Sequence, residues 1–109
     1  MAFRSFTQRM SRNIVNKVKT WVYDRNLHTA DPLKQHEKLK EEVQELLDAL
    51  NADSKCETID AIGDIQVVLI CMCMQLGLNY DLCLEEAYDE IKDRKGRLID
   101  GVFVKEADL

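Results

Sequence analysis

The spacing of apolar residues along the chain predicts helices rather than strands. Over about residues 7–25, apolar residues recur every three or four positions, which is the spacing of one helix face. Asp31 followed by Pro32 indicates that a second helix begins there, with the aspartate as its N-cap, and its pattern continues to about Leu50. The apolar stripes of these two helices are Ile14, Val15, Val18, Trp21 and Val22, and Leu39, Val43, Leu46, Leu47 and Leu50.

A third helix is predicted over about residues 55–76, after a polar break that offers Asp53 or Ser54 as its cap. Its first half carries acids on one face, whereas residues 67–74 are apolar on nearly every side. A helix that is apolar all round has to be enclosed. Because three companion helices in so short a chain are too few to enclose it, we expect a second subunit.

Gly77 ends the third helix, and a fourth is expected from Asn79 or Asp81 to about residue 95. Glycines then break the pattern, so we expect residues 98–109 to form an extended or partly ordered tail. The sequence therefore predicts one all-α domain over residues 1–109. Its architecture is a bundle of about four helices in an obligate oligomer, a dimer or a dimer of dimers.

Composition narrows the class of protein. The chain has 109 residues with one proline, four glycines and few aromatics, which leaves little turn chemistry for a β-sandwich or barrel. A net charge of −5 argues against nucleic-acid binding, which needs a basic footprint.

The longest apolar run falls short of the roughly 20 residues that cross a bilayer, and the first residues lack the apolar stretch of a signal peptide. The four cysteines lack metal or redox spacing. We expect a cytoplasmic protein with reduced thiols and no membrane partner.

Acidic residues of the second helix are the first candidates for metal-binding or catalytic residues. With about 100° of rotation per residue, Glu42 lies on the shoulder of the apolar stripe, and Glu45 lies one turn further along the same edge. Glu41 points away from the core, and we interpret it, like Asp48, as part of a solvated face.

The third helix presents a matching set of acids. Glu57, Asp60 and Asp64 fall within an arc of roughly 60°, and the last two are four residues apart, with side chains about 6 Å from each other. Like charges at that separation repel, and a hard cation such as Mg²⁺, which prefers oxygen ligands, would offset the repulsion. The same face becomes apolar one turn later, which is unusual for a solvated surface. Spacing alone leaves a metal site and a solvated face equally favoured.

Two stretches of the chain resemble the MazG-like family of all-α nucleoside triphosphate pyrophosphatases. The stretch Lys38–Leu46 is similar to the first acidic motif of that family, and Asp60–Ile65, which leads into the apolar run, is similar to its second. The similarity extends to residues 90–97 and 100–105, where it is to small phage-type or prophage-type members. The resemblance implies a dimeric or tetrameric helical bundle that hydrolyses nucleoside triphosphates to monophosphate and pyrophosphate, with Mg²⁺ or Mn²⁺.

The resemblance also assigns roles to residues. The family's pattern is Glu-x-x-Glu followed by Glu-x-x-Asp, and Glu42, Glu45 and Asp64 match three of its four acids. The third acid of the pattern is absent, and Ala61 stands in its place. We expect Asp60 to supply the missing ligand oxygen, with Glu57 as the alternative. The predicted catalytic residues are thus Glu42, Glu45 and Asp64, and the predicted metal ligands are the same three and Asp60.

Candidate substrate-binding residues are three cations and one aromatic side chain. Lys92 and Arg94 lie at the end of the fourth helix, where they suit either a triphosphate or the helix dipole. Lys38 lies one turn before Glu42, so it could reach a phosphate or pair with that carboxylate. Trp21 could stack on a base, although its apolar neighbours favour packing in the core.

Three functions are consistent with these observations. The first is metal-dependent hydrolysis of a (deoxy)nucleoside triphosphate. The second is hydrolysis of phosphoribosyl-ATP, because the enzyme of that reaction shares the helical architecture. The third is a non-catalytic helical adaptor whose acidic site is degenerate at Ala61.

Overall fold

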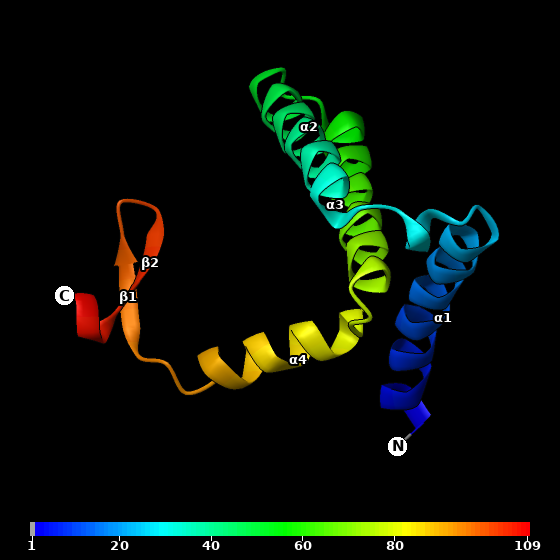
Figure 1. Cartoon of the computed structure of the whole chain (residues 1–109). Coiled ribbons are helices and arrows are strands. Elements are labelled where there is room, and N and C mark those ends of the chain that lie inside the picture. The colour runs from blue at the N-terminus through cyan, green and yellow to red at the C-terminus, as the bar shows by residue number, and fades with distance from the viewer. Residues whose placement is uncertain (1) are drawn as a thin grey trace.

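The computed structural model describes residues 2–109, with their side chains from residue 13 onward. The described residues form four α-helices, a two-stranded antiparallel hairpin and two short 3₁₀ helices (Figure 1). This confirms the predicted all-α class, with a small strand pair added. The elements are α1 (Ala2–Asp24), η1 (Leu27–Thr29), α2 (Pro32–Asn51), α3 (Lys55–Gln75), α4 (Tyr80–Ile91), β1 (Gly96–Ile99), β2 (Val102–Lys105) and η2 (Glu106–Asp108).

Side-chain caps set where three of the helices begin. The Asp31 carboxylate accepts a hydrogen bond of 2.9 Å from the backbone N–H of Leu33 and starts α2. Ser54, rather than Asp53, caps α3, and Asn79 caps α4. Each cap satisfies a backbone donor that the first helical turn leaves without a partner.

The connections after α2 and α3 share one geometry. Asp53 (φ 51°) and Gly77 (φ 68°) adopt the left-handed conformation directly after the helices. The N–H of the following residue then bonds back to a carbonyl five residues earlier, Leu78 to Cys73 at 2.8 Å in the second case. This C-terminal motif closes both helices. After α2 the chain reverses, so that α3 returns alongside α2, whereas after α3 it bends by 105° into α4 (Figure 1).

The C-terminal hairpin is the element that sequence patterning leaves undefined. Residues 98–109, expected to be an extended or partly ordered tail, contain most of this hairpin. Leu98 pairs with Phe103 across the two strands. Asp100 (φ 50°) and Gly101 (φ 82°) form a two-residue turn, and an Asp-Gly dipeptide between apolar runs is a typical signal for this turn.

The helices α2 and α3 make the most extensive contact, and α1 packs against the apolar half of α3. The amide nitrogen of Gln75 donates to the carbonyl of Leu27 at 3.0 Å and ties the end of α3 to η1. Ala49 and Ala61 are both buried and lie between α2 and α3, where small side chains allow the two helices to approach closely. The buried apolar residues are Val15, Val22, Ala49, Ala61, Val68, Ile70 and Cys71.

Much apolar surface of the single chain remains uncovered. Three residues of the α2 stripe, Val43, Leu47 and Leu50, are about half exposed. The helix α4 and the hairpin extend away from the other helices (Figure 1). The radius of gyration is 16.7 Å, compared with about 13 Å for a compact chain of this length. Within residues 2–109, no single helix has the length and apolarity to cross a membrane; only α3 and α4 taken together, across a 105° bend, reach that composition.

Candidate metal centre

Three carboxylates from two helices converge between α2 and α3. Glu42 and Glu45 come from α2, and Asp64 comes from α3. Each offers one oxygen, and the three oxygens all lie within 4.8 Å of one another. The antiparallel pairing of the two helices brings Asp64 next to acids that are about twenty positions away in the sequence. The structure thus brings together all three residues that the sequence matches to the acidic pattern.

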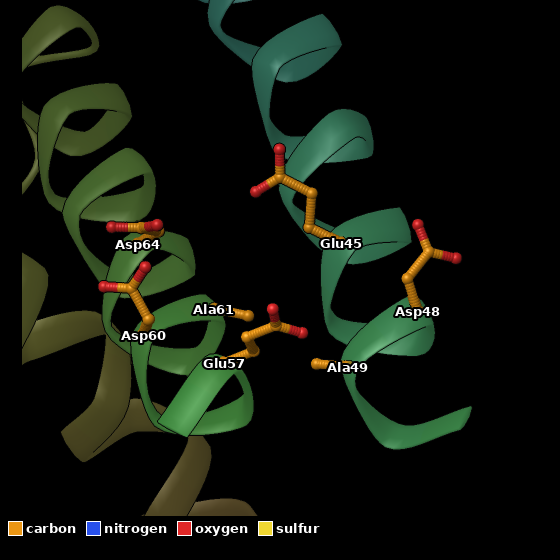
Figure 2. A pocket seen from close by; sticks show the side chains of 7 residues that line it. All are labelled: Glu45, Asp48, Ala49, Glu57, Asp60, Ala61 and Asp64. Carbon is orange, nitrogen blue, oxygen red and sulfur yellow. The ribbon is translucent and has the colours of Figure 1, made fainter. Parts of the chain in front are cut away.

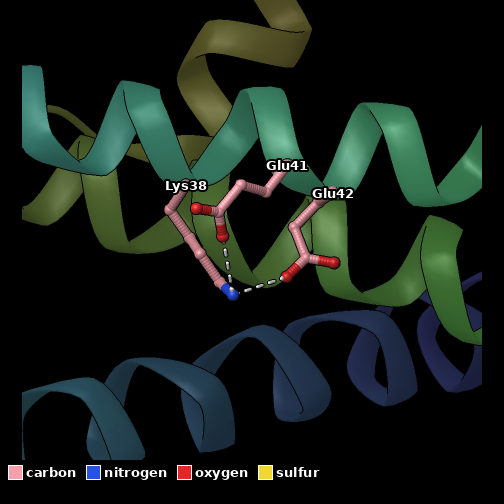
Figure 3. A network of polar contacts seen from close by, with 3 residues as sticks. All are labelled: Lys38, Glu41 and Glu42. Carbon is pink, nitrogen blue, oxygen red and sulfur yellow. Dashed lines mark hydrogen bonds and ion pairs between the residues drawn. The ribbon is translucent and has the colours of Figure 1, made fainter.

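Glu42 is the charged residue at the centre of this cluster. Its exposed fraction is 5%, which makes it the one buried charged residue among those whose side chains are described. One carboxylate oxygen, Oε1, lies 3.1 Å from Nζ of Lys38, which also approaches Glu41 at 3.5 Å (Figure 3). The other oxygen, Oε2, is buried and has no hydrogen-bond partner among the described residues. A buried carboxylate oxygen without a donor is unfavourable, and a bound cation would remove that penalty.

The other two carboxylates hold their protons more tightly than usual. A protonated Glu45 can donate a hydrogen bond to Glu42, and this bond together with the Glu42 charge raises the pKa of Glu45. Burial raises the pKa of Asp64, and the charges of Asp60 and Glu42 raise it further. The cluster therefore repels itself when fully ionised, and a divalent cation is the simplest group that offsets such repulsion.

A cleft of about 230 Å³ is lined by two of the three carboxylates, those of Glu45 and Asp64 (Figure 2). Glu57 reaches from α3 toward α2 in this view, and Asp60 lies beside Asp64 on α3. Asp60 is not one of the three residues whose oxygens converge within 4.8 Å, so its role as a ligand stays a prediction. Ala61, which stands at the third acid of the pattern, is buried at the cleft between the two helices. Asp48 lines the same cleft and accepts a 2.9 Å hydrogen bond from Gln44.

An apolar groove also includes Asp64 in its wall. This groove, of about 450 Å³, lies between α1 and α3 and is lined by Ile14, Val18, Trp21 and Val67 among others. Trp21 is 46% exposed and therefore lies outside the core. The guanidinium of Arg25 lies 4.3 Å from the centre of the Trp21 ring. Sequence periodicity places Ile14 and Val18 in a helix stripe, but it cannot show that the stripe borders a groove.

The basic residues after α4 do not reach the acidic cluster within one chain. Lys92 caps the C-terminal end of α4 and pairs with Asp89 at 3.4 Å. Arg94 follows in the connection to β1. This end of α4 points away from α2 and α3 (Figure 1). In the single chain Lys92 therefore fits the helix-dipole interpretation, and phosphate binding by these two residues stays a prediction.

The donor set of the cluster fits a hard divalent cation. All three converging ligand atoms are carboxylate oxygens, which suit Mg²⁺ or Mn²⁺ rather than a soft metal. Rigid helices hold all three residues, and the orphaned Oε2 of Glu42 is available to a cation because Lys38 engages only the other oxygen.

Comparison with known families agrees with this site. Residues 3–95 match the family described as phosphoribosyl-ATP pyrophosphohydrolase. That family and the MazG-like proteins belong to the same all-α superfamily of nucleotide pyrophosphatases, whose members use a divalent metal. No significant match exists among the curated proteins or the solved structures. Because the match covers most of the chain, including both acidic motifs and all four helices, the protein belongs to the phosphoribosyl-ATP pyrophosphohydrolase family.

Proposed function

We propose that this protein is a Mg²⁺-dependent hydrolase that cleaves a nucleoside triphosphate, or a derivative of one, between the α and β phosphates. The products are the monophosphate and pyrophosphate. The observation that carries the proposal is the convergence of Glu42, Glu45 and Asp64, together with a buried oxygen of Glu42 that has no hydrogen-bond partner among the described residues. Membership of a pyrophosphohydrolase family supports the reaction class.

The carboxylates of the cleft have separate tasks in this proposal. Glu42, Glu45 and Asp64 would hold the divalent cation, which supplies charge neutralisation at the phosphates and a more acidic bound water. Asp60 and Glu57 line the same cleft and are placed to accept the proton of the attacking water. Lys38 orients the Glu42 carboxylate through its 3.1 Å contact with Oε1.

The surroundings of Asp64 match the two ends of a nucleotide. The acidic cleft and the apolar groove both include Asp64 in their walls. If the cation binds the triphosphate in the acidic cleft, the sugar and base of the same nucleotide would lie in the apolar groove, against Trp21. Aromatic side chains bind bases by stacking, and Arg25 already supports one part of the Trp21 ring.

Phosphoribosyl-ATP is the second candidate substrate, and the family match favours it specifically. Its hydrolysis breaks the same phosphoanhydride bond, so the carboxylate cluster serves either molecule. Phosphoribosyl-ATP differs from ATP only in the phosphoribosyl group attached to the adenine base. They are separated by including phosphoribosyl-ATP in the substrate panel.

The test is pyrophosphate release by the purified protein with Mg²⁺, over canonical and modified nucleoside triphosphates and phosphoribosyl-ATP. We expect turnover of at least one substrate, abolished by chelation of the metal. Glu42→Gln should lower kcat/KM by at least about 100-fold, because changes merely beside metal ligands already cost 10–100-fold. Glu41→Gln is the matched control, since Glu41 is the adjacent residue and is exposed, and it should retain activity.

Two results would contradict the proposal. Absence of turnover on every substrate would remove the enzymatic function. Calorimetry that detects no Mg²⁺ or Mn²⁺ binding, or binding that Asp64→Asn leaves unchanged, would favour the non-catalytic adaptor instead.

A further inference from the structure

Two of the four cysteines meet at the bend between α3 and α4. Cys73 lies in the last turn of α3, and Cys83 lies in the first turn of α4. The second helix leaves the first at an angle of 105° (Figure 1), and the protonated thiol of Cys73 donates a hydrogen bond to the sulfur of Cys83. Nine residues separate the two cysteines in the sequence, so the bend is what brings their thiols together.

The backbone of the connection fixes the position of both cysteines. The carbonyl of Cys73 accepts a hydrogen bond of 2.8 Å from the N–H of Leu78, and the N–H of Cys83 donates to the carbonyl of Asn79 at 3.1 Å. The side chain of Asn79 also caps α4. Two sulfur atoms that are already in hydrogen-bond contact need only move together to the ~2.05 Å of a disulfide bond.

The other two cysteines have different surroundings. Cys56 lies in the first turn of α3, about 25 Å from Cys73 along the helix axis by the helical rise. Cys71 is only 2% exposed and accepts a 3.6 Å hydrogen bond from the amide nitrogen of Gln75. Two positions apart on one helix, Cys71 and Cys73 do not face each other. Among the four cysteines, all of them described, an oxidant can therefore link Cys73 and Cys83 most readily.

The two thiols of this pair differ in accessibility. Cys83 is exposed, whereas Cys73 is half-buried. Burial raises the pKa of Cys73, the hydrogen bond and charge of Cys83 raise it further, and the charge of Lys19 on α1 lowers it. A buried thiol with a raised pKa reacts slowly with an oxidant. The exposed Cys83 thus meets the oxidant first, and Cys73 is placed to react with the oxidised sulfur.

We propose that Cys73 and Cys83 form a reversible disulfide when the protein meets hydrogen peroxide. The Cys83 thiolate attacks one peroxide oxygen and the O–O bond breaks, which gives a sulfenic acid and one water. The Cys73 thiol then attacks the sulfenic sulfur, forms the S–S bond and releases a second water. Two thiols lose two electrons and two protons, and one peroxide is reduced to two waters. A dithiol reductant restores both thiols by exchange.

The reduced thiols that the sequence predicts are the resting state of such a pair, because disulfides of reducing compartments are usually transient. The link forms whether or not the acidic cluster is catalytic, since neither cysteine belongs to that cluster.

The disulfide would fix the angle between α3 and α4. None of the twelve residues of α4, all of them described, is buried, so packing within the single chain does little to hold this helix. Tyr80 begins α4 and lines a groove of about 390 Å³ together with Asp60 and Asp64. Because Tyr80 lies less than one turn before Cys83, the link also anchors this part of the groove wall.

The first test is oxidation of the purified full-length protein with hydrogen peroxide, followed by blocking of the remaining thiols and digestion with chymotrypsin, which cuts after Tyr80. Mass spectrometry should detect the fragment with Cys73 joined to the fragment with Cys83, and dithiothreitol should separate them. Cys83→Ser should remove the linked pair. Cys56→Ser is the matched control, because Cys56 is also an exposed cysteine, and it should form the link as wild type does.

The second test is hydrogen exchange of the α4 amides in the reduced and the oxidised wild type. Oxidation should slow the exchange of residues 80–91 by at least about 10-fold, because the link prevents openings in which α4 separates from α3. The same treatment of Cys83→Ser should leave the exchange of α4 unchanged.

Three outcomes would overturn the proposal. The first is treatment with hydrogen peroxide that leaves Cys73 and Cys83 unlinked. The second is a link that joins two chains, detected as fragments of different isotope when ¹⁴N- and ¹⁵N-labelled proteins are mixed and oxidised together. The third is exchange of the α4 amides that is equal in the reduced and the oxidised protein.

Discussion

The ammonium nitrogen of Lys38 lies 3.1 Å from Oε1 of Glu42, one helical turn further along α2. The lysine side chain is 52% exposed and the glutamate side chain only 7%, so a solvated cation holds a buried carboxylate. The contact satisfies one oxygen of Glu42 and leaves the other, Oε2, without a partner among the described residues. Lys38 thus stabilises Glu42 before a metal arrives and still leaves it able to bind one.

The first prediction concerns this pair. Lys38→Met should destabilise the metal-free protein by about 1–3 kcal/mol, because it leaves a buried carboxylate without its donor. Saturating Mg²⁺ should reduce the loss, since a cation then replaces the ammonium. Urea denaturation at fixed protein concentration, with and without chelator, measures both values. Lys34→Met is the control, as its 3.8 Å pair with Glu37 is exposed on both sides and is worth about 0–1 kcal/mol. Equal losses for the two variants would contradict the prediction.

The second prediction decides whether Asp60 or Glu57 supplies the ligand in place of the acid that is absent at position 61. Asp60 lies one turn before Asp64 and its charge raises the pKa of that residue, so Asp60→Asn should weaken Mg²⁺ binding by about 10–100-fold. Glu57→Gln should change the affinity much less, because Glu57 lies one further turn away along α3. Calorimetric titration of both variants measures the affinities, and a larger effect for Glu57 would reverse the assignment.

The third prediction is a pH dependence of the metal-free protein. Burial and neighbouring charges raise the pKa of Asp64 in the folded chain above its ordinary value of 3.8. The folded state then binds the proton more tightly than the unfolded state, so stability falls as the pH rises from 3.8 through the raised pKa.

Asp64→Asn removes that penalty. At neutral pH and with chelator present, the variant should unfold about 2–5 °C above wild type, a shift that corresponds to less than about 1 kcal/mol. The difference should shrink as the pH is lowered toward 3.8, where wild-type Asp64 is protonated. Thermal melts across this pH range test the prediction, and a difference independent of pH would show that Asp64 does not cause it.

The fourth prediction concerns the apolar groove. Trp21→Leu should raise KM for the accepted nucleotide by about 10-fold with little change in kcat, because stacking on a base contributes roughly 1–3 kcal/mol. Tyr23→Leu is a matched control on the same helix, since the Tyr23 ring stacks on His28 at 4.6 Å and does not line the groove. A fall in kcat with unchanged KM would place Trp21 outside the base-binding surface.

The site was predictable from sequence only in part. Spacing on α2 and α3 placed Glu42, Glu45 and Asp64 on helix edges, and their motifs matched known acids. The apolar groove beside Asp64 was not predictable, because residues such as Ile14 and Val18 have the same spacing whether they line a core or a groove.

The sequence by itself determined the local structure of this protein. Capping residues such as Asp31 and Asn79, and the left-handed Gly77, act within a few positions of the chain, so the pattern located the starts of α2 and α4 and the end of α3. The expected end of the fourth helix at about residue 95 was wrong, because α4 ends at Ile91 and the hairpin begins at Gly96. Tertiary structure decided how the helices pair and which side chains meet between them. Only the antiparallel pairing of α2 and α3 brings Asp64 to Glu42, buries that glutamate and leaves one of its oxygens without a donor. Burial and charge repulsion arise from residues distant in sequence, and helical spacing within one segment carries no information about them.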